Sequence, residues 1–210
     1  MPYLLNKGYR LRGYRNLPTG LLDVGRGETL FFAKDEYRVL LACDGIRELA
    51  PGEMAEGDRQ VLQELLARKI VRQSVFGEML APDQVYRRYP VDYYRGAQWS
   101  VTGGCNLRCR HCFMSAPQGK HATPTFGQLV HVADQLRECG VHRVGITGGE
   151  PLIRGDFLPL LDVLKEREVV LTTIYTNGWL VDGRLLDELD ARGMHPSFQL
   201  SFDGLGQHDF

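Results

Sequence analysis

The chain lacks any strong charge imbalance and any long apolar run. Its 25 lysines and arginines nearly balance 26 aspartates and glutamates, so the formal net charge is −1. A charge this small gives no long-range field that would attract nucleic acid or an anionic membrane. No segment approaches the roughly 20 apolar residues that span a bilayer, and residues 1–10 lack the apolar region of a secretion signal. We therefore expect no membrane partner and residence in the cytoplasm.

Cysteine is also scarce, and its spacing argues against disulfide bonds. There are five cysteines, an odd number that makes a poor disulfide framework and suits a metal site in a reducing compartment. Cys43 and Cys139 stand alone, and we expect both to be packed as small hydrophobic side chains. The other three, Cys105, Cys109 and Cys112, fall within one run of eight residues.

The length predicts two units. A chain of 210 residues exceeds the usual domain size of about 100–150 residues, and 43% hydrophobic with 24% charged residues is ordinary for a folded protein. The change of pattern along the sequence predicts a first domain over residues 1–82, a linker over 83–97 and a second domain over 98–210.

The first domain is predicted to be a small winged-helix-like α+β unit. Apolar runs on either side of residues 25–27 predict a hairpin within 21–32, and helices fit residues 35–42 and 58–69. A second hairpin is predicted over 71–80, with its turn at residues 76–78. The linker that follows interleaves tyrosine and arginine, a mixture that can bind single-stranded nucleic acid. Because the stretch is short and the chain is not basic, we favour a simple connector and consider a nucleic-acid partner disfavoured.

From residue 98 onward the pattern alternates between strands and helices, which is typical of a mainly parallel sheet with helical crossovers. Thr123, Asp156 and Asp182 are predicted to cap the three helices. The chain ends soon after the last strand with no helix to cover it, so we expect it to be a truncated α/β domain. The predicted strands are 98–102, 143–147, 169–176 and 197–201.

Polar motifs follow each of these strands. In βα folds the loops at the carboxyl ends of the strands build the active site, so the four motifs should meet on one side of the sheet. Paired glycines allow the backbone to approach a ligand closely, and a carboxylate beside them suits an ammonium group. In strand order the candidate residues are Cys105, Cys109 and Cys112; Gly148, Gly149, Glu150 and Pro151; Asn177; and Ser201 and Asp203.

Three cysteine ligands leave one coordination position open. In an iron–sulfur cube, that position is an iron with no protein ligand, available to a substrate or cofactor. In a zinc site it would hold water or a fourth ligand such as His111 or His121. The cysteine spacing alone leaves both alternatives open.

Taken together, the cysteine run and the Gly148–Pro151 motif resemble those of the radical S-adenosylmethionine (radical SAM) superfamily, over residues 99–210. The resemblance implies a [4Fe–4S] cluster on the three cysteines, with S-adenosylmethionine (SAM) chelating its open iron and its amino group held by the glycine motif. It also implies a partial (βα)6 TIM-like barrel, of which this chain would carry the first four strands. By position, Asn177, Ser201 and Asp203 would contact the ribose or methionine carboxylate of SAM.

The activity implied by this resemblance is reductive cleavage of SAM to a 5′-deoxyadenosyl radical that abstracts hydrogen from a substrate. An electron donor such as a flavodoxin or ferredoxin would supply the electron. The first domain resembles, more loosely, the leader-peptide-recognition domains of peptide-modifying SPASM-type members, which makes a precursor peptide the expected partner. The alternative is a metal- or cluster-sensing winged-helix transcriptional regulator, although the balanced charges of residues 58–69 argue against DNA binding.

Overall fold

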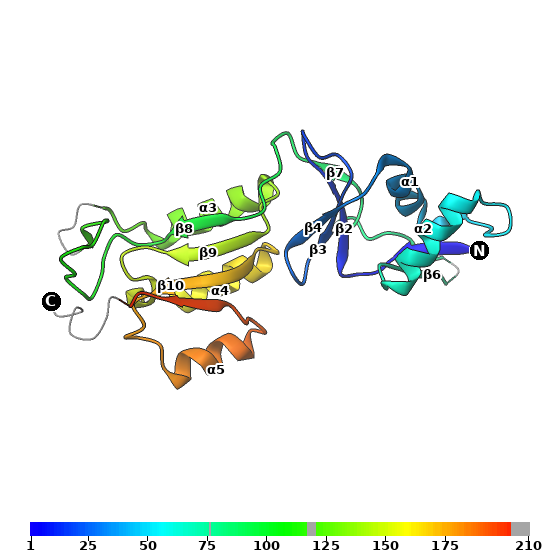
Figure 1. The fold of residues 1–210 in the computed structure, drawn as a ribbon. Coiled ribbons are helices and arrows are strands. Elements are labelled where there is room, and N and C mark those ends of the chain that lie inside the picture. Colours follow the sequence, from blue (N-terminus) through cyan, green and yellow to red (C-terminus); the bar gives the residue numbers. More distant parts are fainter. Residues whose placement is uncertain (76, 117–120, 203–210) are drawn as a thin grey trace. The chain divides into compact units, whose positions relative to one another are not determined.

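The structure is a computed structural model that describes residues 1–75, 77–116 and 121–202 (Figure 1). It divides into two compact units, Met1–Tyr93 and Tyr94–Phe210. Because the division falls after Tyr93, most of the predicted linker belongs to the first unit, while Ala97 already begins a strand of the second.

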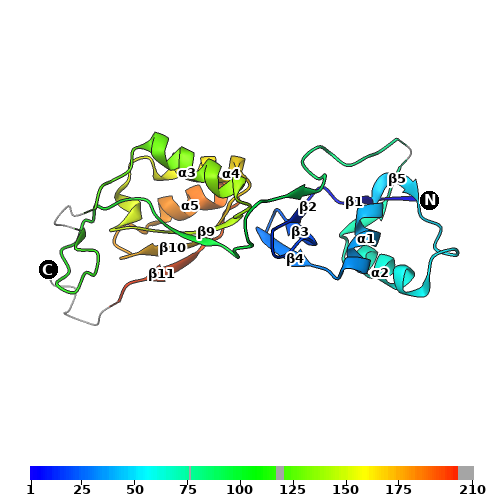
Figure 2. The same ribbon diagram turned by 90° about the horizontal axis from the view of Figure 1, so that it is seen from above.

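Among its described residues, the first unit contains two small sheets and two helices (Figures 1 and 2). One sheet has the antiparallel order β5-β1-β6, and the other has the order β4-β3-β2-β7, in which only β7 runs parallel to its neighbour. Its elements are β1 (Pro2–Leu5), β2 (Tyr9–Gly13), β3 (Gly20–Asp23), β4 (Glu28–Phe31), α1 (Lys34–Ala42), β5 (Asp44–Glu48), α2 (Glu56–Ala67), β6 (Val71–Gln73) and β7 (Arg87–Arg88).

The predicted first hairpin and both predicted helices are confirmed as β3, β4, α1 and α2, within two residues at each end. Four strands of the described residues escaped prediction, namely β1, β2, β5 and β7. The second hairpin keeps only β6, and Phe76 of its predicted turn lies outside the described residues. Since β5 separates the two helices, the predicted order of two strands, two helices and two strands is not found. The structure therefore shows an α+β unit and does not establish a winged helix.

The core of the first unit forms where α1 and α2 pack on the β5-β1-β6 sheet. Leu5, Leu40, Leu62 and Leu65 are each at most 2% exposed. The α2 leucines are three positions apart, so they lie on one face of the helix. Each fully buried leucine contributes about 1.5–3 kcal/mol relative to an exposed one, so this contact holds the helices to the sheet.

Two tyrosines of the predicted linker, Tyr89 and Tyr93, are explained by packing, whereas Tyr94 is 62% exposed. Tyr89 is 2% exposed and stacks on the buried ring of Tyr14, with ring centroids 5.2 Å apart. Tyr93 packs edge-on against both Tyr14 and Phe31. These rings form an aromatic cluster within the first unit, so they do not offer a free surface for stacking bases.

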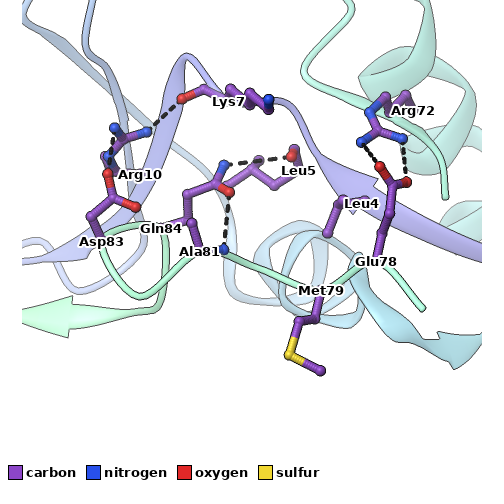
Figure 3. A pocket seen from close by; sticks show the side chains of 10 residues that line it. All are labelled: Leu4, Leu5, Lys7, Arg10, Arg72, Glu78, Met79, Ala81, Asp83 and Gln84. Carbon is purple, nitrogen blue, oxygen red and sulfur yellow. Dashed lines mark hydrogen bonds and ion pairs between the residues drawn. The ribbon is translucent and has the colours of Figure 1, made fainter. Parts of the chain in front are cut away.

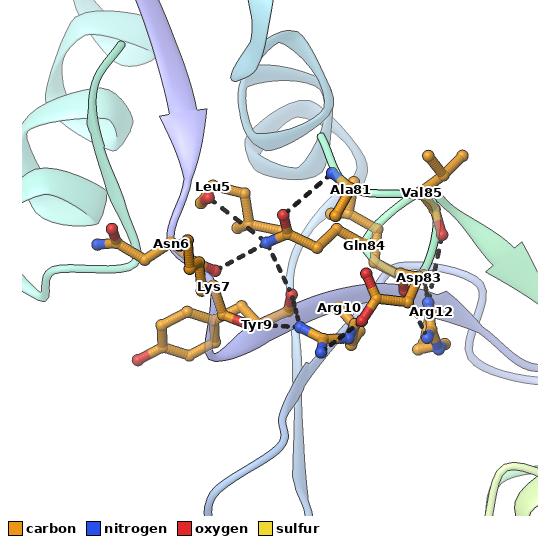
Figure 4. Close-up of polar contacts among 11 residues, drawn as sticks. Leu5, Asn6, Lys7, Tyr9, Arg10, Arg12, Ala81, Asp83, Gln84 and Val85 are labelled. Atoms are coloured by element: carbon orange, nitrogen blue, oxygen red, sulfur yellow. Dashed lines mark hydrogen bonds and ion pairs between the residues drawn. The ribbon is translucent and has the colours of Figure 1, made fainter. Parts of the chain in front are cut away.

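Gln84 fastens the segment before β7 to the turn between β1 and β2 (Figure 4). Its side-chain nitrogen donates to the carbonyls of Asn6 (2.9 Å) and Tyr9 (3.2 Å), and its side-chain oxygen accepts from the Ala81 amide (3.3 Å). Next to it, Arg10 forms an ion pair with Asp83 at 2.6 Å. Gln84 is 4% exposed, so its own buried amide finds in these groups the hydrogen-bond partners that water would otherwise supply.

The second unit is a parallel sheet of order β11-β10-β9-β8, and the helices lie on one face of it (Figure 2). Buried side chains from that face and from the helices form a single core, centred on Val144, Ile146, Leu160 and Leu164. None of the described helices is long and apolar enough to cross a membrane. The elements are β8 (Ala97–Ser100), α3 (Phe126–Glu138), β9 (Arg143–Thr147), the 3-10 helix η2 (Pro151–Ile153), α4 (Phe157–Glu166), β10 (Val170–Thr176), α5 (Gly183–Ala191) and β11 (Ser197–Leu200).

The predicted strands of the second unit are confirmed within two residues at each end, and the parallel α/β class is confirmed. Of the three predicted helix caps, only Asp182 is confirmed with its hydrogen bond. Asp182 caps α5 by accepting from the Leu185 amide at 2.8 Å. The cap of α3 is Thr125 rather than Thr123, because Gln128 completes a reciprocal capping pair with Thr125. Asp156 occupies the cap position of α4, but its carboxylate binds Arg154 instead of the helix amides.

Replacing Gln84 with leucine tests whether the hydrogen bonds of Gln84 stabilise the turn between β1 and β2. Because the carbonyls of Asn6 and Tyr9 would each lose one of their two donors, and the turn would lose its link to the segment before β7, Gln84→Leu should lower the free energy of unfolding of the first unit by about 1–3 kcal/mol. Hydrogen exchange at the amides of β1 and β2 measures this change directly. Gln60→Leu, on the exposed face of α2, is the matched control and should change exchange little. Equal protection in the two variants would show that Gln84 has no such role.

Candidate active site

The cysteine loop and the glycine motif are joined by backbone hydrogen bonds just past the ends of β8 and β9. The amide of Gly149 donates to the carbonyl of Thr102, and the amide of Glu150 donates to the carbonyl of Gly104, both at 2.9 Å. The two loops therefore continue the parallel pairing of their strands for several residues. This confirms the expectation that the acidic turn and the cysteines lie on the same side of the sheet.

Gly148 and Gly149 are required by the closeness of this approach. A Cβ on Gly148 would lie 2.6 Å from the carbonyl oxygen of Thr102, and a Cβ on Gly149 would collide with the carbonyl oxygen of Gly104. Both obstacles are backbone atoms, which cannot rotate away. Any side chain here would push the cysteine loop off the turn.

Glu150 is fully buried, and its carboxylate binds its own chain. It accepts hydrogen bonds from the amides of Leu152 (3.0 Å) and Asn177 (2.8 Å) and from the hydroxyl of Thr176 (2.9 and 3.0 Å). This network ties the turn after β9 to the end of β10. The carboxylate was expected to face a ligand's ammonium group, but every one of these contacts directs it inward.

Asn177 links the loop after β10 to the cysteine loop. Its side-chain nitrogen donates to Asn106 Oδ1 at 2.8 Å and lies 4.0 Å from the sulfur of Cys105. Ser201 is exposed, and its amide donates to the carbonyl of Thr176 at 3.0 Å. Asp203 lies outside the described residues. The structure thus brings Cys105, Glu150 and Asn177 into one contiguous site, with Ser201 at the next strand end.

The three clustered cysteines are free thiols and are partly exposed. The amide of Leu107 donates to the sulfur of Cys105 at 3.4 Å, and the amide of Cys112 donates to the carbonyl of Cys109 at 3.2 Å. Burial raises the pKa of the Cys105 thiol. The Leu107 hydrogen bond lowers that pKa, whereas the nearby Glu150, Cys109 and Cys112 raise it. A positively charged metal centre would reverse this balance by stabilising the thiolates.

The chemistry of this donor set fits a cluster better than a single ion. Zinc needs all its sulfur ligands about 2.3 Å from one centre. Within residues 1–75, 77–116 and 121–202, no three histidine, cysteine or acidic side chains are arranged to hold one ion, and that includes His111 and His121. In an iron–sulfur cube each thiolate binds a different corner, so the ligands spread over a wider area. Three partly exposed thiols on one loop suit the second arrangement.

The two remaining cysteines differ from one another. Cys43 is 1% exposed, and burial raises the pKa of its thiol to about 12, so its prediction as a packed residue is confirmed. Cys139 is exposed at the end of α3, and its prediction as a packed residue is wrong. The buried stripe of α3 runs through Leu129 and Ala133, and Cys139 lies beyond the last turn of that stripe.

Three site residues were missed by sequence reasoning: Thr102, Asn106 and Thr176. The Thr102 hydroxyl accepts from the Gly104 amide at 3.0 Å and contacts the Thr123 hydroxyl at 3.1 Å, which shapes the start of the cysteine loop. Thr176 donates to the buried Glu150. Their only signal in the sequence is their place at or beside a strand end, because hydroxyl and amide groups there give no spacing pattern.

Of the cavities outside this hydrogen-bond network, one lies in each unit at a place that matters here. The larger, about 480 Å³, is on the face of the sheet opposite the helices, beside the cysteine loop. It is lined by Gln98, Ser100, Phe113, Met114, His121 and Thr147. The other, about 320 Å³, is in the first unit beneath the segment held by Gln84 (Figure 3), and its rim carries the bidentate ion pair between Arg72 and Glu78.

Comparison with protein families adds a match to the model described as the radical SAM superfamily, over residues 99–208. The curated relatives include GTP 3′,8-cyclases from Pasteurella multocida and Peptoclostridium acidaminophilum. The first is 32% identical over 134 residues, which cover 54% of this chain and 37% of the relative. The second is 36% identical over 115 residues, which cover 53% and 35%. The chain thus spans about a third of the length of the curated relatives it matches.

Solved structures similar to this fold include Streptococcus suis SuiB bound to S-adenosylmethionine. The TM-score is 0.57 with 16% sequence identity, and the match covers 97% of this chain and 49% of SuiB. SuiB bound to its precursor peptide SuiA matches with a TM-score of 0.54 and the same identity. At this identity the likeness concerns the fold, and it extends over both units of the chain.

An alanine at Gly149 tests the close approach of the two loops. Gly149→Ala should lower the free energy of unfolding of the second unit by about 1–3 kcal/mol, since the new Cβ would displace the backbone at Gly104. Both tryptophans of the chain lie in this unit, so fluorescence during urea unfolding reports its stability. Gly155→Ala is the matched control, because a Cβ there meets nothing within 4 Å. A Gly149→Ala protein as stable as the control would contradict this role.

Proposed function

The chain belongs to the radical SAM superfamily, and from this premise we propose that it acts on a ribosomally made precursor peptide. Members of this enzyme family use a [4Fe–4S] cluster and SAM, so both predicted cofactors are those of the family. Together the two groups supply one-electron cleavage of a carbon–sulfur bond and hydrogen-atom abstraction by a 5′-deoxyadenosyl radical. The transcriptional regulator considered from the sequence is not retained, since the family is one of enzymes.

One observation carries the proposed chemistry: the glycine turn is hydrogen-bonded directly to the cysteine loop through Gly149 and Glu150. A ligand on a cluster held by Cys105, Cys109 and Cys112 would therefore meet the backbone of residues 148–151. In our proposal this backbone receives the amino group of SAM, and Glu150 positions the turn from behind without touching the ligand.

The remaining predicted contacts are proposed at the neighbouring strand ends. Asn177 is 4.0 Å from the Cys105 sulfur, which supports a contact with the methionine carboxylate or ribose of SAM. Ser201, and Asp203 beyond the described residues, would extend this side of the site. The open face of the sheet, with its cavity beside the cysteine loop, would belong to a partial (βα)6 barrel and face the substrate.

The peptide part of the proposal rests on the free edge of β4 in the first unit. β4 pairs only with β3 among the described strands, and a groove separates it from α2. The amide of Phe32 donates to the carbonyl of Thr19, so by alternation Thr29 and Phe31 direct their amides away from β3. An added strand would bond to these groups. The groove is lined by Leu30, Phe31, Phe32, Glu36, Val61, Glu64, Leu65 and Arg68.

The structure of SuiB bound to its precursor peptide SuiA supports this choice of partner. We further propose that the protein works in the cytoplasm, where its five cysteines, all unpaired among the described residues, would stay reduced. A flavodoxin or ferredoxin would then supply the electron.

Electron paramagnetic resonance of the anaerobically reconstituted full-length protein tests the cofactors. Reduction should give a cluster signal, and adding SAM should change that signal because SAM binds the open iron. Cys109→Ala should abolish cluster assembly, measured by iron and sulfide content, whereas Cys139→Ala should leave it intact. A signal indifferent to SAM, or equal loss in both variants, would refute the ligand assignment.

The peptide proposal has its own measurement, made with synthetic precursor peptides whose genes adjoin that of this protein. Binding should slow hydrogen exchange at Thr29 and Phe31, whose amides would become bonded to the added strand. Exchange on the β5 edge, at Ile46 and Arg47, serves as the internal control and should stay unchanged. Protection of both edges, or of neither, would count against strand addition at β4.

A further inference from the structure

The loop that carries the three cysteines is positively charged and exposed. Arg108 and Arg110 both lie on the surface of the loop. No aspartate or glutamate occurs in the sequence between Asp92 and Asp134, although acidic residues slightly outnumber basic ones in the whole chain. The positive charge is therefore a local feature of this loop and not a property of the protein.

These two arginines also differ from others in the same unit. Arg154, Arg167 and Arg192 each form an ion pair with a carboxylate, at 2.7 to 2.9 Å. Arg108 and Arg110 have no ion pair or side-chain hydrogen bond within residues 1–75, 77–116 and 121–202. Their charges face solvent and are available to a partner.

An exposed aromatic side chain adjoins the loop. Trp179 is 65% exposed, and its amide donates to Asn177 Oδ1 at 3.0 Å. Asn177 in turn donates to Asn106 of the cysteine loop at 2.8 Å. Tryptophan and arginine are the residues that most often dominate the binding energy of protein interfaces. We call Asn106, Arg108, Arg110 and Trp179 the donor surface.

We propose that the donor surface is the docking site of a small acidic protein that delivers single electrons. The proposal rests on the proposed function, since it requires a cluster on the three cysteines. Opposite charges would steer the two proteins together and set the docking orientation. Asn177, in contact with both Trp179 and Asn106, lies 4.0 Å from the Cys105 sulfur, so a partner docked here reaches the cluster ligands directly. The carrier would lose one electron and a cluster held by Cys105, Cys109 and Cys112 would accept it, with no bond formed or broken.

A simpler explanation is that the arginines only compensate the negative charge of thiolates and cluster. That explanation predicts the same loss of reduction with every reductant, because it acts through the cluster itself. Docking predicts a loss that depends on the charge and size of the reductant. A protein carrier and a small cationic reductant therefore distinguish the two explanations.

The test uses the full-length reconstituted protein with two reductants, reduced flavodoxin and reduced methyl viologen. Stopped-flow absorbance should show that Arg108→Glu/Arg110→Glu slows reduction by flavodoxin at least about tenfold at low salt. The rate for the unmodified protein should fall steeply with salt, and the rate for the variant should not. Reduction by the methyl viologen cation should be as fast as before or faster. Arg137→Glu, at the far end of α3, is the matched control and should behave like the unmodified protein.

Calorimetry with oxidised flavodoxin and cluster-free protein provides a readout that needs no cluster. Binding should be lost in the double variant, weakened in Trp179→Ala and retained in Arg137→Glu. Equal slowing with both reductants, or unchanged flavodoxin binding in the double variant, would overturn the proposal. If reconstitution itself fails, the proposed function fails, while the binding measurement still decides the docking surface.

Discussion

The active-site end of the second unit depends on one buried carboxylate. Glu150 has no exposed surface, and it accepts hydrogen bonds from the chain at Leu152, Thr176 and Asn177. A buried carboxylate is costly unless polar groups replace its water, and here neutral amides and a hydroxyl do so. Since those donors come from two different loops, the loops cannot separate without leaving this group unsatisfied. The position of Asn177 beside Cys105 follows from that constraint.

The glycines extend the same constraint to the cysteine loop. Glu150 fixes the turn after β9, and the missing side chains of Gly148 and Gly149 let the chain at Thr102 and Gly104 come within hydrogen-bonding distance. Backbone bonds thus set the start of the cysteine loop, while the thiols remain partly exposed. A loop that is fixed by its backbone while its thiols stay accessible suits a site that must take up a metal cluster, because the geometry of the loop does not depend on burying the ligands.

Sequence patterns predicted the second unit well because its strands and helices have strong, separate periodicities. The strands β8 to β11 and the cap at Asp182 follow from apolar runs and cap residues. The first unit was predicted less well. β5 is rich in charged residues and exists through its pairing with β1, a contact between distant parts of the chain that no local pattern encodes.

The same limit applies to the site. Sequence spacing located the cysteines and Gly148–Pro151, but it could not give the direction of the Glu150 side chain, which only the donors at Thr176 and Asn177 decide. Burial of Cys43 and exposure of Cys139 likewise depend on which helix turn meets the core. Local residue types thus indicate which ligand a site can bind. Tertiary contacts decide which residues touch that ligand and which hold those residues in place. At this site Glu150 holds other residues in place and, in the proposed function, does not touch the ligand. The charges of Arg108 and Arg110 lie on the surface of the cysteine loop, where a partner can reach them.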